Sequence, residues 1–139
     1  MSKTRLSDPS GPLAFFAYTY LNAGGAQCTV HLAREFRKVT EIEVIDVYGD
    51  CAGYMADLRS VGISPTVLFP NYHGKTTIGD ESGIGRLAQM GVVLPHTLHT
   101  ALRLRRALQR IKPRAMWVDD EKALFVAWLA FSGGSDLPL

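Results

Sequence analysis

The chain has 139 residues, of which 47% are hydrophobic and 20% are charged, and its formal net charge is +2. This length supports one hydrophobic core rather than two domains, and so small a charge gives no reason to expect a nucleic-acid partner. No apolar stretch approaches the ~20 residues that span a bilayer. The two cysteines, Cys28 and Cys51, have no metal-binding or disulfide-framework spacing, which is usual in reduced cytoplasmic proteins.

Residues 1–12 are polar and rich in proline and glycine, so we predict a flexible leader before one domain over residues 13–139. A basic start followed by an apolar run is also the pattern of a secretory signal peptide. Asp8 and Pro9 interrupt that pattern, and Tyr18 lies within the apolar run. We therefore expect a cytoplasmic protein.

The first apolar run, Leu13–Leu21, does not alternate with polar residues, which is typical of a strand buried on both faces. A helix pattern over Ala26–Lys38 follows it. Paired glycines lie at the junction, where they leave room for a ligand, and a helix N-terminus there attracts anions. The junction therefore predicts either a phosphate site, made by Gly24, Gly25, Ala26 and Gln27, or a tight turn without a ligand.

The middle of the chain continues the alternation of strands and helices. We predict a strand over Glu41–Tyr48, a short helix from Tyr54 to Val61 that closes at Gly62, and a strand over Thr66–Phe69. The next segment, Asn71–Gly91, has five glycines and little periodicity, so it reads as an exposed loop with at most a helical turn.

The last third begins with a strongly amphipathic helix after Pro95, which Pro113 ends. Its apolar stripe is Leu98, Ala101, Leu104, Leu108 and Ile111, and its opposite face carries Arg103, Arg106 and Arg110. A strand over Ala115–Val118, a helix over Ala123–Phe131 and the opening of a fifth strand at Asp136–Leu139 complete the pattern. The arginine face reads either as a solvated surface or as a contact with anionic lipid at a membrane surface.

This order of elements predicts an α/β fold with a doubly wound parallel sheet. Ligands on such sheets bind beyond the carboxyl ends of the strands. The residues predicted there are the glycine turn, Asp46–Asp50 and the acidic run Asp119, Asp120 and Glu121. The acidic run is interpreted either as a cap for the last helix or as a group of carboxylates that accept hydrogen bonds from ligand hydroxyls. A metal site is disfavoured, because the sequence offers no further ligands beside these acids.

Three segments in this order resemble the nucleotide-sugar glycosyltransferases of GT-B fold, family 4. They are Gly24-Gly-Ala-Gln27 opening a helix that contains Leu32-Ala-Arg-Glu-Phe36, the stretch Asp57–Ser64, and the basic helix Leu102–Pro113. The similarity covers about Leu13 to Gly134. Members of that family have two Rossmann-like domains with the active site in the cleft between them.

The resemblance implies that this chain is the N-terminal, acceptor-side domain, truncated before its last strands. The donor nucleotide-sugar would be held mainly by a second domain, so the chain alone would not catalyse transfer and would contain no catalytic residue. The resemblance further implies transfer to an acceptor hydroxyl with retention of configuration and without a metal or other cofactor. Gly24–Gln27 would contact the donor phosphates, and Asp119, Asp120 and Glu121 would contact the acceptor.

One departure from the family concerns the strand over Ala115–Val118. In members of that family the corresponding strand commonly ends in a His-x-His-like stretch. The equivalent positions in this chain are Trp117 and Asp119. Indole cannot act as a base, and a carboxylate recognises hydroxyls or cations. Two further hypotheses therefore remain open: a non-catalytic α/β domain that binds a phosphorylated small molecule, or a degenerate product that persists as a homodimer through its sheet edge.

Overall fold

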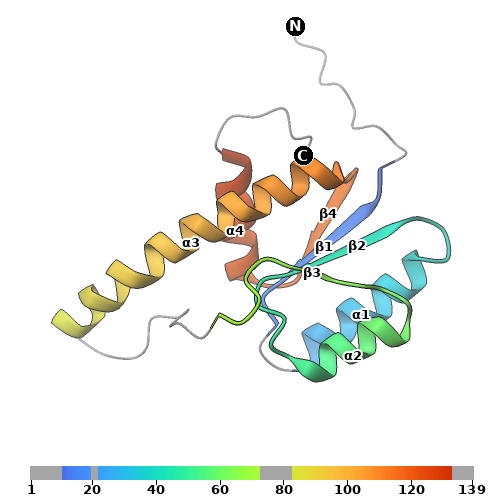
Figure 1. Cartoon of the computed structure of the whole chain (residues 1–139), viewed down its shortest axis with the longest axis horizontal. Helices are drawn as coiled ribbons and strands as arrows, with labels where there is room; N and C mark the ends of the chain where they lie inside the picture. The colour runs from blue at the N-terminus through green and yellow to red at the C-terminus, as the bar shows by residue number, and fades with distance from the viewer. Residues whose placement is uncertain (1–10, 20–21, 73–82, 133–139) are drawn as a thin grey trace, which may run out of the picture.

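A four-stranded parallel sheet forms the centre of the molecule (Figure 1). The structure is a computed structural model, and it describes residues 11–19, 22–72 and 83–132. Its strands lie in the order β3-β2-β1-β4. Their bounds are β1 (Leu13–Ala17), β2 (Ile42–Asp46), β3 (Thr66–Val67) and β4 (Ala115–Val118). All three neighbouring pairs are parallel, and Phe15 of β1 pairs with both Val44 and Trp117. The predicted α/β fold with a doubly wound parallel sheet is confirmed.

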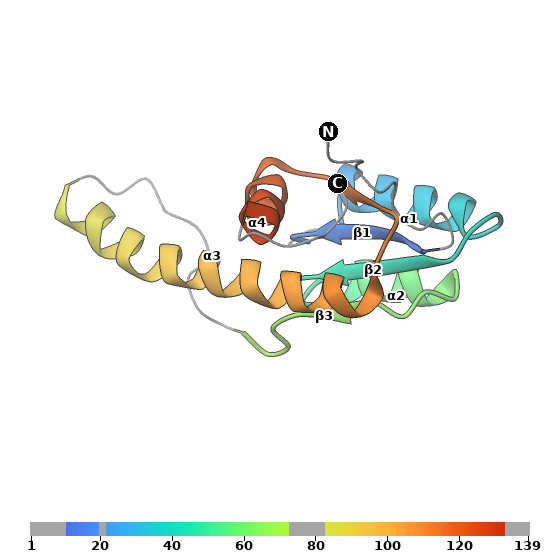
Figure 2. The ribbon, with the colours of Figure 1, turned by 90° about the horizontal axis from the view of Figure 1, so that it is seen from above.

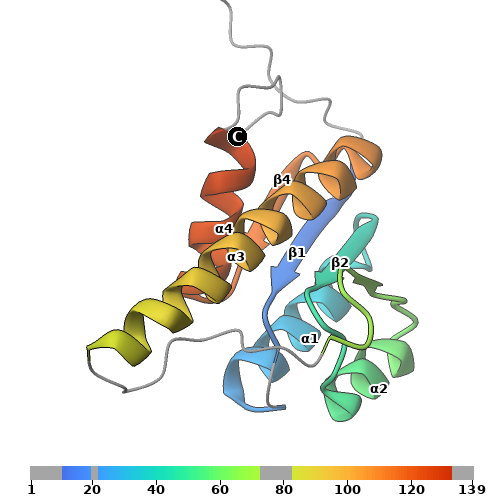
Figure 3. The same cartoon turned by 60° about the vertical axis from the view of Figure 1, so that its left-hand side comes forward.

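The helices cover both faces of this sheet (Figures 1 and 3). On one face lie α1 (Gly24–Phe36) and α2 (Ala52–Ser60), and on the other lie α3 (Ile84–Ile111) and α4 (Glu121–Ser132). Successive strand residues point to opposite faces, so Phe15 joins the core under α1 and α2 while Phe16 joins the core under α3 and α4. Burial on both faces explains why β1 reads as a continuous apolar run.

The direction of chain travel reverses at β1. The chain builds β2 and then β3 on one side of β1, and afterwards returns across the sheet to place β4 on the other side. After β1 the chain continues into α1 on one face of the sheet, and after the neighbouring β4 it continues into α4 on the other face. Such a topological switch point is where open α/β sheets bind their ligands.

The strands are shorter than the sequence predicted. β1 ends at Ala17 rather than at the predicted Leu21, and residues 20–21 lie outside the described part of the chain. β2 is shorter than predicted at both ends, and β3 is shorter at its C-terminal end. In contrast, α1 begins two residues before the predicted Ala26. The paired glycines are therefore the first turn of α1 itself.

The prediction of a loop over Asn71–Gly91 is wrong from Ile84 onward, because α3 begins there and runs through Pro95. The buried face of its first half consists of Gln89, Val93, Thr97 and Thr100. Leu98, predicted for the buried stripe, is 54% exposed. The N-terminal end of this helix extends well past the strands (Figure 2).

Two other predictions concern the C-terminal half. Arg106 and Arg110 are exposed as predicted, whereas Arg103 turns inward, donates a hydrogen bond to the Leu68 carbonyl and stacks over the Phe69 ring at 4.3 Å. The predicted fifth strand at Asp136–Leu139 lies outside the described residues, as does most of the predicted leader. Among the described helices, none combines the length and apolar character needed to cross a membrane.

A buried carboxylate joins the ends of β1 and β2. Asp46, the last residue of β2, is fully buried. Its Oδ1 accepts a hydrogen bond from the Thr19 N–H at 3.2 Å, and its Oδ2 accepts from the N–H groups of Tyr48 at 3.2 Å and Gly49 at 2.6 Å. Burial raises the pKa of Asp46, against the effect of these bonds. The side chain therefore fixes where the backbone goes after both strands.

We expect Asp46→Ala to lower the free energy of unfolding by about 3 kcal/mol or more, because three N–H groups lose their acceptor in a site closed to water. Urea unfolding measures the change. Asp50→Ala, which removes an exposed aspartate four residues away, is the control and should stay within about 0.5 kcal/mol of the unchanged protein. Equal effects of the two substitutions would contradict the structural role of Asp46.

Candidate ligand-binding site

A pocket of about 270 Å³ lies at the switch point between β1 and β4. Three short segments line it: Tyr18 and Thr19 after β1, Ala23, Gly25 and Ala26 at the start of α1, and Asp119 and Asp120 after β4. The sequence predicted a phosphate site on the second segment and an acceptor site on the third. The fold brings parts of both predicted sites into one pocket.

The α1 end of the pocket is a helix N-terminus without a side-chain cap. Ala23 occupies the N-cap position and cannot cap the helix, and the first backbone bond of α1 is donated by Gln27 to the Ala23 carbonyl. The N–H groups of Gly24, Gly25 and Ala26 thus have no intrahelical acceptor. A Cβ atom built on Gly25 would meet nothing within 4 Å. The helix end therefore offers donors and a positive dipole to an open space.

The floor of the pocket contains a hydroxyl that the sequence analysis did not single out. Thr19 is 5% exposed, and its side chain lies beside the Asp46 carboxylate and the Tyr54 hydroxyl. The Tyr54 hydroxyl is also buried, and its pKa is raised by burial and then by the charges of Asp46 and Asp119. Thr19 therefore brings to the pocket a hydroxyl oxygen that can donate or accept a hydrogen bond.

The β4 end of the pocket is acidic. Asp119 is open to solvent, and partial desolvation followed by the charge of Asp120 raises the pKa of its carboxyl to about 6. Asp120 caps α4, because its Oδ1 accepts the Ala123 N–H at 2.7 Å. Glu121 lies in the first exposed turn of α4 and is not among the residues that line the pocket. Of the three predicted acids, Asp119 is thus the one that lines the pocket and does not cap α4.

Gln27 lies at the side of the site rather than in it. Its Nε2 donates to Asn22 Oδ1 at 2.6 Å and to Asp57 Oδ2 at 2.9 Å, and Asn22 Nδ2 also donates to Asp57. These bonds attach the loop before α1 to the middle of α2 and lower the pKa of Asp57. The Gln27 side chain therefore positions the glycine turn, whereas Gly25 and Ala26 face the pocket.

Sequence reasoning missed Thr19, although its hydroxyl within an apolar run was a usable signal at the end of a strand. Lys122 brings a cation to one of the lining residues, with its Nζ 4.6 Å from the Tyr18 ring centroid. Within residues 11–19, 22–72 and 83–132, no three histidine, cysteine or acidic side chains come together as a metal site. The pocket thus combines anion donors on α1 with a hydroxyl and a carboxylate opposite them, which suits a ligand that carries both phosphate and hydroxyl groups.

Comparison with known proteins adds no identity, since no family model and no curated protein matches this chain.

The raised pKa of Asp119 makes a prediction about stability and pH. The native state binds the proton more tightly than the unfolded chain, whose aspartate pKa is near 3.9, so Asp119 lowers stability progressively from about pH 4 to about pH 6. We expect Asp119→Asn to unfold at a higher urea concentration than the unchanged protein at pH 7, with no difference at pH 3.5. A gain from Asp119→Asn that is equal at both pH values would contradict the assignment.

Proposed function

We propose that this chain is the acceptor-binding N-terminal domain of a retaining, nucleotide-sugar-dependent glycosyltransferase. The observation that carries the proposal is the convergence of the α1 N-terminus and Asp119 on one pocket at the switch point. The resemblance of three segments to GT-B glycosyltransferases of family 4 supports it. The pocket and the resemblance are independent observations, because the resembling segments say nothing about β1 and β4 being neighbours in the sheet.

The two halves of the pocket have different roles in this proposal. The N–H groups of Gly25 and Ala26, two residues that line the pocket, stabilise negative charge on a departing diphosphate, since they are in place before the reaction and need no reorganisation. Asp119 accepts a hydrogen bond from an acceptor hydroxyl, and Thr19 Oγ1 donates to or accepts from a second oxygen. Transfer itself needs a domain that holds the nucleotide, so the activity of these 139 residues is binding.

A second candidate function is a binding module for a phosphorylated small molecule. The size of the pocket favours it, because about 270 Å³ lies near the lower end of ligand sites and matches one sugar phosphate better than a nucleotide-sugar. In this case the phosphate sits on α1 and the sugar hydroxyls on Asp119. The two functions share the same residues and differ in whether the nucleotide is needed.

Titration followed by amide NMR distinguishes these functions. The ligands are uridine and guanosine diphosphate sugars, hexose phosphates and unphosphorylated sugars. Shifts at Thr19, Gly25 and Asp119 with a hexose phosphate alone favour the binding module. Weak binding of the hydroxyl-bearing sugars, with little added by the nucleotide, favours the acceptor-side domain. If no ligand shifts these three amides, both proposals are wrong.

We expect Gly25→Ala to separate binding from stability. Its methyl group enters the open pocket, so affinity for a phosphate-bearing ligand should fall about tenfold or more. Because alanine favours a helix over glycine, the free energy of unfolding should be unchanged or higher by up to about 1 kcal/mol.

Gly24→Ala is the matched control, since Gly24 also meets no neighbour but does not line the pocket. It should give the same stability and keep the affinity. Calorimetric titration and urea unfolding of both variants provide the measurements, and an equal loss of affinity in both would argue against ligand contact at Gly25.

A further inference from the structure

The N-terminal half of α3 carries a row of exposed apolar positions. Steps of three and four residues alternate along this row, so its members lie on one side of the helix. The row consists of Ile84, Leu87, Gly91, Leu94 and Leu98. Its four large side chains are between 49% and 86% exposed. A continuous apolar surface of this kind marks an interaction site.

The row continues into the contact between α3 and α4. Ala101 and Leu108 fall on the same repeat, and both are buried in the core that α4 helps to form. α4 has 12 residues, whereas α3 has 28 and extends well past the strands (Figure 2). The repeat is thus covered in the second half of α3 and exposed in the first half. Because one helix already covers part of the repeat, a second helix suits the rest of it.

We propose that the N-terminal halves of α3 from two copies of this chain pack against each other in antiparallel fashion. A two-fold axis between Gly91 and Leu94 places Leu94 of each copy against Gly91 of the other, and Leu87 against Leu98. A Cβ atom built on Gly91 would meet nothing within 4 Å, so this position offers a hole for the leucine side chain. The pairing is independent of the proposed function.

Charge favours the antiparallel arrangement over a parallel one. Between Ile84 and Leu98 the sequence has one arginine, Arg86, and no acidic residue, so the row itself carries little charge. The remaining arginines of α3 are Arg103, Arg105, Arg106 and Arg110. An antiparallel pair holds the two groups of arginines at opposite ends of the interface. A parallel pair would bring them together, and like charges juxtaposed at an interface are unfavourable.

A membrane surface suits the α3 row less well than a second helix does. Helices that lie on a bilayer carry lysine or arginine along the same stretch as their apolar face. In α3, all but one of the arginines follow Thr100, beyond the exposed row. The apolar row and the cations therefore lie toward different ends of the helix.

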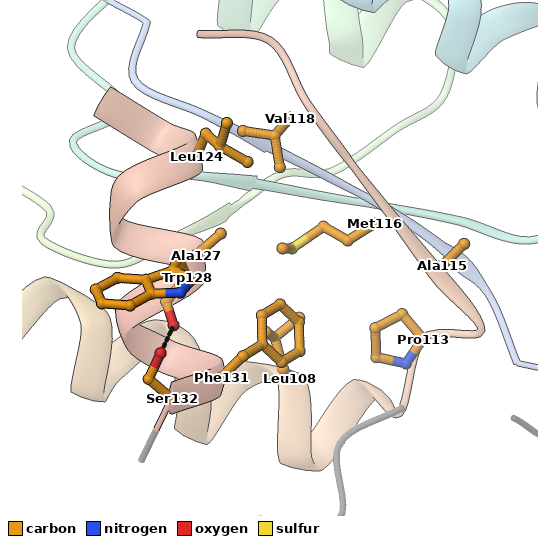
Figure 4. Close-up of a pocket in the computed structure, with 10 residues that line it drawn as sticks. All are labelled: Leu108, Pro113, Ala115, Met116, Val118, Leu124, Ala127, Trp128, Phe131 and Ser132. Carbon is orange, nitrogen blue, oxygen red and sulfur yellow. Dashed lines mark hydrogen bonds between the residues drawn. The ribbon is translucent and has the colours of Figure 1, made fainter. Parts of the chain in front are cut away.

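A second exposed apolar surface lies on α4, but its shape is unsuited to pairing with itself. Leu124 and Trp128 border a pocket of about 430 Å³, and Met116 and Phe131 point into it (Figure 4). A two-fold axis would place this hollow against the same hollow in the other copy and leave both unfilled. The α3 row combines large side chains with a small one, so it can fill its own gap.

The size of the contact predicts a weak, reversible dimer. Four large side chains from each copy bury on the order of 1,000 Å² in total, near the lower limit for a specific interface. We therefore expect a Kd in the micromolar range.

Sedimentation velocity of the unchanged full chain over about 1–300 µM tests the proposal. The sedimentation coefficient should rise with concentration from that of a monomer to that of a dimer. Leu94→Glu should raise the Kd about 100-fold or more, because each copy then brings a carboxylate into the apolar contact. Leu87→Glu repeats the test at a side chain that is 69% exposed, where a substitution disturbs folding least. Leu124→Glu places the same charge on the exposed face of α4 and, as the matched control, should leave the Kd unchanged.

Two sedimentation results would overturn the proposal. One is an unchanged chain that stays monomeric at the highest concentration. The other is a dimer that Leu124→Glu dissociates and Leu94→Glu does not, since that assigns the contact to α4. Circular dichroism checks that each variant is folded.

Flotation with vesicles of phosphatidylcholine and phosphatidylglycerol tests the membrane alternative. If the unchanged chain forms no dimer but floats with the vesicles, and Leu94→Glu abolishes flotation, the row belongs to a lipid surface and the proposal is wrong. A dimer that Leu94→Glu dissociates, with no flotation of the unchanged chain, supports the pairing of two copies.

Discussion

The site depends on the buried carboxylate of Asp46. Three backbone N–H groups from two separate chain turns converge on this one side chain. One of them belongs to Thr19, so the position of the pocket floor after β1 is set by the last residue of β2. A buried charge of this kind is stable only where the backbone supplies its solvation, and that requirement fixes both turns together. The conformation of the candidate site is thus set by a side chain buried at the end of β2 rather than by the surface loops alone.

The second constraint is topological. β1 and β4 become neighbours only because the chain reverses its direction of travel at β1, and this reversal brings residues about a hundred positions apart to one pocket. The α1 end contributes donors and the β4 end contributes an acceptor. These two ends agree with the function proposed above, in which the ligand carries both an anionic group and hydroxyls.

Much of the fold could be predicted from the sequence because most elements obey simple periodicity. β4 was predicted to the residue, and the helix predicted after the first strand is present, although it begins at Gly24 rather than Ala26. The start of α3 could not be predicted, since its buried face is made by Gln89, Thr97 and Thr100 while Leu94 and Leu98 are exposed. Two of those polar residues bond to carbonyls of their own helix, Thr97 to Val93 and Thr100 to His96, so they can be buried without an external partner. The apolar residues Leu94 and Leu98 thus point away from the core, whereas Ala101, Leu104 and Leu108 of the predicted stripe are buried.

In the candidate site, too, features set by adjacent residues could be predicted, whereas features set by contacts between distant parts of the chain could not. Local sequence identified the glycine turn and the acidic run separately, because helix N-termini and carboxylates have local signals. It could not separate the three acids, since their roles depend on what lies across the pocket. Asp120 is committed to the α4 N-terminus and Glu121 lies outside the pocket lining, which leaves Asp119.

Asp119 also differs from its neighbours in electrostatics. Partial desolvation and the adjacent Asp120 bring its pKa to about 6, so its carboxyl changes charge close to physiological pH. When protonated it can donate a hydrogen bond to a phosphate or hydroxyl oxygen, and when ionised it only accepts one. The repulsion between Asp119 and a phosphate held on α1 is thus reduced when the carboxyl takes up a proton. In the proposed function, a single carboxyl at this position therefore serves both an anionic ligand and a hydroxyl ligand.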